Sequence, residues 1–157
     1  MHSNPIFKQT PTGFSTEFLT NEIVMWGRAR GIIQHSTSSA QASKTGEEVE
    51  ELKEHVAQLK FLRTEIRGRF NAIIEYSKLA LGHSKSLEDS INDTYGKMEA
   101  DLLSKLVDDY GDIFVTLVMG AEIEGIDIRS CIASAFNEIK DRRGEMRADG
   151  KFYKEGS

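Results

Sequence analysis

The sequence predicts an all-α fold, a helical bundle of five or six helices with no convincing strand. Apolar residues recur at helical spacing along most of the 157 residues. Both prolines lie within the first eleven residues, so no proline interrupts a helix later in the chain. Aromatic residues, which favour strands, make up only 8% of the chain. A chain of this length is expected to form one domain.

Residues 1–20 are polar and contain both prolines, which predicts an irregular N-terminal arm. The single domain is expected over residues 21–157, and its first helix is expected to begin with Thr20 as the N-cap. This helix carries Trp26, the only tryptophan. We expect its large side chain in the core, with the apolar wall of a ligand pocket as the alternative.

A highly acidic helix is predicted to begin near Ser43. On a helical wheel, Glu48, Glu51 and His55 share one edge of its apolar stripe, and Glu47 lies just beyond Glu51. Carboxylates three residues apart repel each other, and burial further disfavours their charged form. They therefore need water, a cationic partner or a divalent metal ion. A solvated surface helix is the simpler interpretation of this segment taken alone.

The helical pattern continues through residues of about 60–100, and a second acidic cluster follows. In that cluster Asp109 and Asp112 flank a broad apolar face, and no charged residue follows before Glu122. We therefore expect both carboxylates to be buried or half-buried, whereas Asp108 is expected to face water. Two helices that each offer carboxylates three residues apart can converge on a site suited to Mg²⁺ or Mn²⁺.

The C-terminal part of the chain predicts one more helix. Gly125 is a suitable stop for the preceding helix, and Asp127 is a suitable N-cap for the next one. Gly144 is expected to end that helix. Whether the helical pattern before Gly125 forms one helix or two is left open by Gly96 in its middle.

The two acidic segments resemble the signature of the MazG-like all-α nucleoside triphosphate pyrophosphohydrolases. That family carries an E-E-x-x-E helix followed by an apolar E-x-x-D helix. Residues 47–51 match the first half, and residues 109–112 match the second with Asp in place of Glu. The segment 26–31 and the tail 138–155 also resemble family members. The interval between the two halves is longer than usual, so residues of about 60–100 are interpreted as a helical insertion.

The resemblance implies a hydrolase that converts a nucleoside triphosphate and water into the monophosphate and pyrophosphate, with deoxynucleotides favoured. The implied cofactor is Mg²⁺, for which Mn²⁺ can substitute. Metal binding is assigned by the resemblance to Glu48, Glu51, Asp109 and Asp112. The catalytic role of orienting or deprotonating the attacking water falls to Glu47. The substrate-binding residues implied are Trp26, Gln41, Lys44, Lys140, Arg142 and Arg143. The last three cations equally suit the C-terminal end of a helix dipole.

Family members usually pair, which implies a homodimer or homotetramer. An apolar fraction of 39% agrees with a core that another subunit completes. A net charge of −5 does not suggest a nucleic-acid polymer as partner, and the longest apolar run is too short for a membrane span. The single Cys131 and an N-terminus unlike a secretory leader lead us to expect a cytoplasmic protein.

A non-catalytic acidic helical interaction module is the competing interpretation. In such a module the carboxylates bind counter-ions or a basic partner. Burial of Asp109 and Asp112 separates the two interpretations. A buried carboxylate lowers stability, so burial of this pair favours a functional site over a simple scaffold. A di-metal bundle with oxygen chemistry is a third class, but its usual Glu-x-x-His pair is missing beside either acidic cluster.

Overall fold

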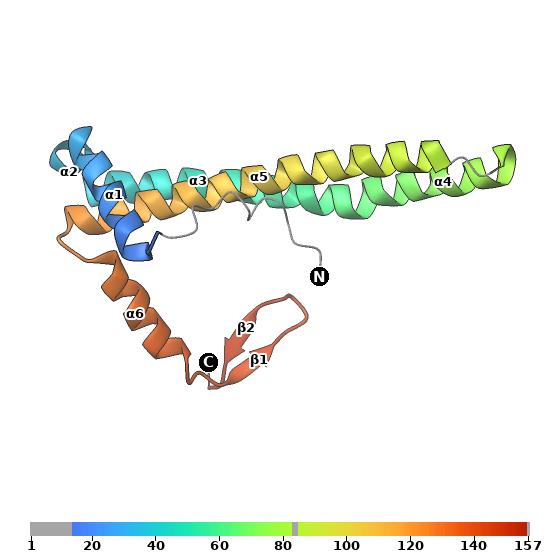
Figure 1. The fold of residues 1–157 in the computed structure, drawn as a ribbon. Coiled ribbons are helices and arrows are strands. Elements are labelled where there is room, and N and C mark those ends of the chain that lie inside the picture. The colour runs from blue at the N-terminus through green and yellow to red at the C-terminus, as the bar shows by residue number, and fades with distance from the viewer. Residues whose placement is uncertain (1–13, 83–84, 157) are drawn as a thin grey trace.

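A long antiparallel hairpin of two helical arms forms the frame of the molecule, as the computed structural model shows (Figure 1). The structure describes residues 14–82 and 85–156. The elements in chain order are α1 (Thr16–Ala29), α2 (Ile32–His35), α3 (Ser38–Phe61), the π-helix η2 (Leu62–Ile66), α4 (Arg67–Leu81), α5 (Lys85–Ile123), α6 (Ile128–Ile139), β1 (Gly144–Met146) and β2 (Phe152–Lys154). The chain is thus mostly helical, and the all-α prediction is confirmed at that level.

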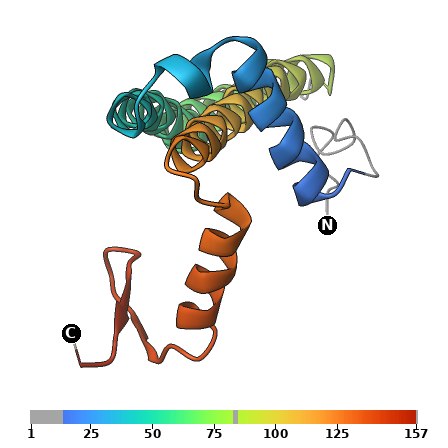
Figure 2. The same ribbon diagram turned by 90° about the vertical axis from the view of Figure 1, so that its left-hand side faces the viewer.

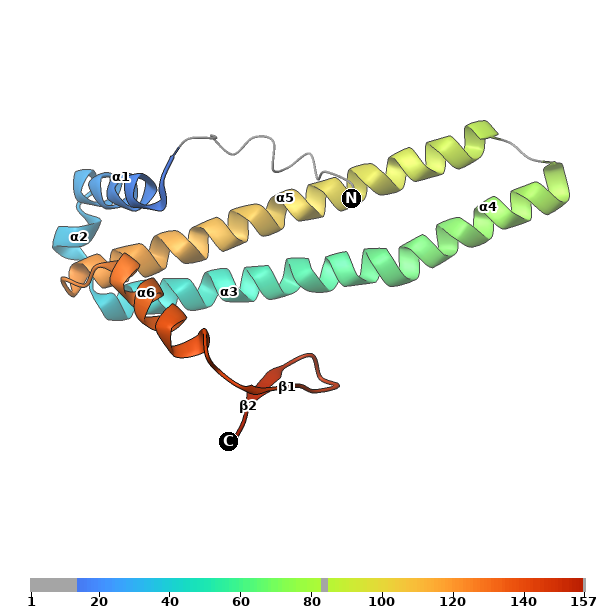
Figure 3. The same ribbon diagram turned by 60° about the horizontal axis from the view of Figure 1, so that its bottom comes forward.

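The first arm consists of α3, η2 and α4 in continuous succession, and α5 is the second arm (Figure 3). The two arms meet along one seam, which contains both apolar side chains and buried polar ones such as Glu48, Asp109 and Thr116. The buried apolar residues among those described are Leu59, Leu62, Ile74, Val118 and Met119. Two paired helices each bury one stripe and leave the rest of their surface open. The core is therefore narrow, and most large apolar side chains keep some exposure.

The segment expected as an insertion forms the far half of this hairpin and no separate body. Arg63 Nε lies 2.7 Å from Glu99 Oε1, and Arg67 Nη1 donates to Asn92 Oδ1 at 3.1 Å. The Arg67 guanidinium also lies over the ring of Tyr95, 4.6 Å from its centroid. These polar contacts tie α5 to the first arm at η2 and at the start of α4. The helical pattern before Gly125 belongs to one helix, α5.

The first helix begins earlier than predicted. Ser15 is its N-cap, and its hydroxyl oxygen accepts a hydrogen bond from Phe18 N at 3.1 Å. Thr20, the predicted cap, lies inside α1, is 3% exposed and donates its hydroxyl to Thr16 O. The prediction of an irregular arm is therefore wrong for residues 16–20, and residues 1–13 lie outside the described part. A threonine can satisfy its hydroxyl within the helix as well as at its start, so the sequence allowed both interpretations.

The turn after α5 matches the prediction, whereas the end of the chain does not. Gly125 adopts a φ of +68° and Asp127 accepts a hydrogen bond from Arg129 N at 2.9 Å as the N-cap of α6. Gly144 does not end a helix but begins β1, which pairs antiparallel with β2. The prediction that the chain has no strand is wrong in this small respect. An Asp-Gly turn before β2, with Gly150 at a φ of +78°, supports the pairing.

α1 and α2 pack against one end of the hairpin (Figure 2). α1 packs on α5, where the buried Met119 lies against Gly27. α6 points away from the hairpin and exposes an apolar face that includes Ile132, Phe136 and Ile139. In the described residues, no helix combines the length and apolar character that crossing a membrane requires.

We predict that Gly27→Val destabilises the protein by about 1–3 kcal/mol, because a Cβ at this position collides with the thioether of Met119 and Met119 is 1% exposed. The matched control is Gly96→Ala in α5, where an added Cβ meets nothing within 4 Å. That change should raise the free energy of unfolding by about 1 kcal/mol through helix propensity. Urea denaturation measures both. Equal effects of the two substitutions would contradict the packing of α1 on α5.

Candidate functional site

Two side-chain contacts fix how α3 lies against α5 at the acidic end of the hairpin. Thr45 Oγ1 donates to Thr116 Oγ1 at 2.8 Å, and His55 Nδ1 lies 2.8 Å from Asp109 Oδ2. Between these contacts lie the predicted ligands Glu48 and Glu51 on α3 and Asp112 on α5. The structure therefore brings the two acidic segments, about sixty residues apart in the chain, to one stretch of the seam.

Glu48 is the most enclosed carboxylate of the acidic helix, with 6% exposure. Its Oε1 lies 2.9 Å from Lys44 Nζ, and the same ammonium lies 3.0 Å from Glu47 Oε2. The carboxylates of Glu48 and Glu47 raise the pKa of Lys44 above its usual value. Lys44 thus neutralises part of the acidic cluster. It joins the predicted catalytic residue Glu47 to the predicted ligand Glu48.

Asp109 is buried as predicted, with 5% exposure, and its partner is His55 on the other arm. We expected His55 to act as a neighbour of Glu48 and Glu51 on its own helix, but it contacts Asp109 across the seam instead. Asp112 is exposed, so the prediction that it is buried or half-buried is wrong. The physical reason is that α1 does not close over this part of α5, and Asp112 lines the open groove between the two helices.

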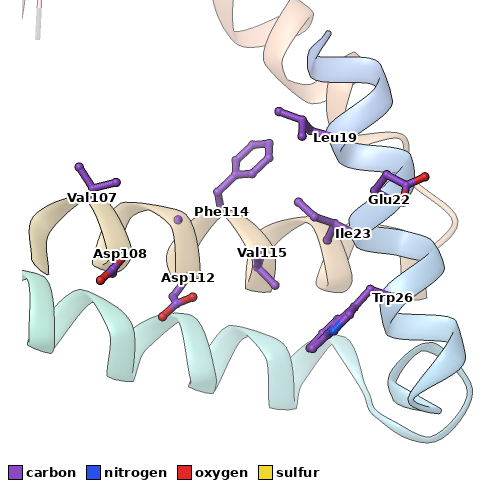
Figure 4. Close-up of a pocket in the computed structure, with 10 residues that line it drawn as sticks. Leu19, Glu22, Ile23, Trp26, Val107, Asp108, Asp112, Phe114 and Val115 are labelled. Atoms are coloured by element: carbon purple, nitrogen blue, oxygen red, sulfur yellow. The ribbon is translucent and has the colours of Figure 1, made fainter. Parts of the chain in front are cut away.

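A groove of about 920 Å³ lies between α1 and α5 and contains two of the predicted site residues (Figure 4). Its walls are Leu19, Glu22, Ile23 and Trp26 from α1 and Val107, Asp108, Gly111, Asp112, Phe114 and Val115 from α5. Trp26 is 43% exposed, so its expected place in the core is wrong and the alternative, a pocket wall, is what the structure has. Apolar side chains line most of the groove, with carboxylates along it.

Three residues of this groove region were missed by sequence reasoning. Asp108 is exposed as expected, but it also lines the groove together with Asp112, which was not predicted. Their spacing of four residues on one helix was a usable signal, because such residues share a face. Glu22 adds a carboxylate from α1. The guanidinium of Arg30 lies over the Trp26 ring, 4.5 Å from its centroid, and no spacing in the sequence indicated that contact.

The remaining predicted substrate residues lie apart from the groove. The acidic helix α3 begins at Ser38, earlier than the predicted start near Ser43, and Gln41 lies in its first turn. The Gln41 amide donates to Ser36 Oγ at 3.0 Å. Lys140, Arg142 and Arg143 follow α6, which leads away from the hairpin (Figure 1). Arg143 lines a hollow beside the β-hairpin with Arg147 and Tyr153. Within one chain, the structure does not bring these cations to the carboxylates.

The donor chemistry of the acidic stretch suits a hard divalent cation, since all four predicted ligands offer carboxylate oxygens. In the part of the chain that the structure describes, however, no three acidic, histidine or cysteine side chains form a group that could hold a metal ion. Glu48 is engaged by Lys44 and Asp109 by His55. Metal binding by Glu48, Glu51, Asp109 and Asp112 therefore stays a prediction, and it requires these two partners to release the carboxylates.

Comparisons of the chain with family models, with curated proteins and with solved structures find no match. The residues and their arrangement are therefore the basis for a functional interpretation.

We predict that the His55–Asp109 pair carries a coupling energy of at least about 1 kcal/mol. His55→Leu leaves a buried carboxylate without its partner and should cost about 1–3 kcal/mol, and adding Asp109→Leu should recover much of that loss. Urea unfolding of the two single variants and the double variant measures the coupling. A second double-mutant cycle with Arg63→Ala and Glu99→Ala is the control. This pair also joins the two arms but is more exposed, so a coupling energy of at most about 0.5 kcal/mol is expected. Equal coupling in both cycles would contradict the prediction.

Proposed function

We propose that this protein is a metal-dependent nucleoside triphosphate pyrophosphohydrolase that releases a monophosphate and pyrophosphate, with deoxynucleotides favoured. The observation that carries the proposal is the groove in which Trp26 shares a hollow with Asp108 and Asp112, on the same helix as the buried Asp109. An aromatic wall next to a cluster of carboxylates is the combination that a base and a metal-bound polyphosphate require. The resemblance of residues 47–51 and 109–112 to the MazG-like signature supports the same reaction.

The α1 side of the groove is suited to the base and sugar. The whole groove has a volume of about 920 Å³, which lies within the range of roughly 300–1,000 Å³ typical of ligand pockets. Trp26 offers a flat apolar face, and Leu19 and Phe114 extend the apolar surface. A base held there directs its phosphates along α5 toward Asp108 and Asp112.

Glu48, Glu51, Asp109 and Asp112 would hold Mg²⁺, or Mn²⁺ in its place. When bound, the metal neutralises phosphate charge and lowers the pKa of a coordinated water. For this to occur, Lys44 must leave Glu48 and His55 must leave Asp109. The freed ammonium of Lys44 then lies close enough to the cluster to meet a phosphate oxygen. Glu47 is free at the same moment to orient or deprotonate the attacking water.

The cations at the end of α6 act on the leaving pyrophosphate only if they reach the groove. Lys140, Arg142 and Arg143 lie away from it within one chain (Figure 1). In a homodimer or homotetramer, the corresponding cations of a neighbouring copy can supply this contact. The uncovered apolar face of α6 is consistent with packing against another subunit.

A non-catalytic interaction module remains the second candidate, and one observation favours it. Both enclosed carboxylates already have partners, Lys44 for Glu48 and His55 for Asp109. Partnered carboxylates of this kind also occur in purely structural helix pairs. The exposure of Asp112 removes one of the two buried carboxylates on which the enzymatic interpretation depended. Turnover separates the two candidates.

We predict that the protein releases pyrophosphate from one or more of the eight common NTPs and dNTPs with Mg²⁺ or Mn²⁺. Glu48→Gln and Asp112→Asn should each lower turnover at least about 100-fold, because each removes a charged metal ligand. Glu50→Gln is the matched control, since Glu50 is exposed and pairs with Lys53 on the same helix. Product analysis by ion-exchange chromatography measures all four proteins.

No turnover of any nucleotide by folded wild-type protein would exclude the hydrolase and favour the interaction module. Equal losses in Glu48→Gln and Glu50→Gln would contradict the assigned site. Mn²⁺ affinity measured by calorimetry gives a second readout. It should fall in the two ligand variants and stay unchanged in Glu50→Gln.

We predict that nucleotides change the fluorescence of Trp26, because the chain has one tryptophan and it lines the groove with 43% exposure. Titration with a dNTP in the presence of Ca²⁺, in place of the catalytic metal, should quench the emission in a saturable manner. Inorganic triphosphate, which lacks a base, is the control and should cause little quenching. Equal quenching by both ligands would contradict base stacking on Trp26.

A further inference from the structure

A regular row of side chains that the proposed function does not use runs along one edge of the first arm. Each member directly precedes a residue on the seam side of the arm. The row is Glu54, Phe61, Arg69 and Tyr76, and the seam-side residues that follow them are His55, Leu62, Phe70 and Ser77. Successive members are seven, eight and seven residues apart. The one extra residue falls where η2 intervenes, and a π turn accommodates one additional residue, so the row keeps to one edge.

Two aromatic side chains in this row face solvent. Phe61 is 51% exposed and Tyr76 is 70% exposed. Beside Phe61 lies an apolar groove of about 490 Å³ between the two arms, lined by Met98 and Leu102 of α5 together with residues of the first arm. Met98 is itself 41% exposed. A large exposed aromatic residue next to an apolar hollow is typical of an interaction surface.

Opposite charges flank Phe61 at nearly equal distances along the arm. Glu54 precedes Phe61 along the arm and Arg69 follows it, each at about 11 Å from Phe61 by the rise of the helix. The Glu54 carboxylate accepts a hydrogen bond from Gln58 on its own helix, at 3.1 Å. Within the described residues, Arg69 forms no ion pair. A surface with an acid and a base placed symmetrically about an apolar centre is complementary to itself when turned by a two-fold rotation.

We propose that a second copy of this chain packs antiparallel on this edge, with the two-fold axis at Phe61. Each Phe61 then meets the groove beside Phe61 of the other copy, and each Glu54 faces Arg69 of the other copy. The row from Glu54 to Tyr76 spans about 33 Å and the two arms are about 20 Å wide, a footprint of roughly 600 Å² on each copy. This approaches the ~800 Å² per partner of a standard interface. The surface lies outside the acidic groove, so the inference does not depend on catalysis.

The first test measures mass in solution by sedimentation equilibrium. The wild type should be a dimer, or a tetramer built from such dimers. Glu54→Arg and Arg69→Glu should each raise the dissociation constant of this interface at least about 100-fold, because every dimer then contains two like-charge contacts. Lys60→Glu is the matched control, since it reverses an exposed charge on another face of the same arm. Circular dichroism checks that each variant remains helical.

The second test mixes the two single variants. In a heterodimer of Glu54→Arg with Arg69→Glu, both facing pairs are again of opposite charge, so the mixture should associate although neither variant does so alone. The double variant Glu54→Arg/Arg69→Glu should also regain the wild-type mass. A monomeric wild type would overturn the proposal and leave the edge to a different partner. Unchanged masses of both single variants, or a mixture that stays monomeric, would overturn the antiparallel register.

Discussion

The packing of one continuous helical arm against α5 is the constraint on which the rest of the molecule depends. Two helices that meet along one seam can bury only one stripe each, and the buried apolar residues described are correspondingly few. Polar contacts therefore help to fix how the arms align. If the arms slipped by one helical turn, Asp109 would lose His55 and stay enclosed, at the cost of an unpaired buried carboxylate. The pairing of Asp109 with His55 thus helps to specify how the two arms align, and the acidic residues gather at one end of the hairpin.

Helical periodicity was sufficient to predict the arms but not what covers them. A helical wheel shows which residues share a face, and it placed Glu48 and Asp109 beside the seam, where both are buried, whereas Glu51 from the same predicted edge is exposed. It contains no information about whether another element lies over that face. Trp26 and Asp112 were therefore expected to be enclosed, and both are exposed because α1 crosses α5 without closing over it. The helix cap Asp127 was predictable because capping is a local interaction.

The site was predictable to the extent that it lies on the two arms. Glu48 and Asp109 come from segments whose residue types and spacing indicated enclosed carboxylates, and both are buried. Lys140, Arg142 and Arg143 could not be placed, because a short connection between α5 and α6 sets the direction of α6. A few backbone angles around Gly125 decide that direction, and no periodic pattern encodes them. Asp108 was missed although its spacing from Asp112 would have placed both on one side.

The π turn explains how the long insertion is compatible with the acidic end of the hairpin. Seam-side residues follow a seven-residue spacing from His55 to Leu62 and again from Phe70 to Ser77, with eight residues between Leu62 and Phe70. In a regular α-helix that extra residue would rotate everything beyond it by about 100°. The arm would then turn its charged face toward α5. Because η2 absorbs the residue, Ile74 returns to the seam without any change in the orientation of Glu48 and His55. The far half of the hairpin therefore lengthens the molecule while leaving the carboxylates at the other end packed against α5.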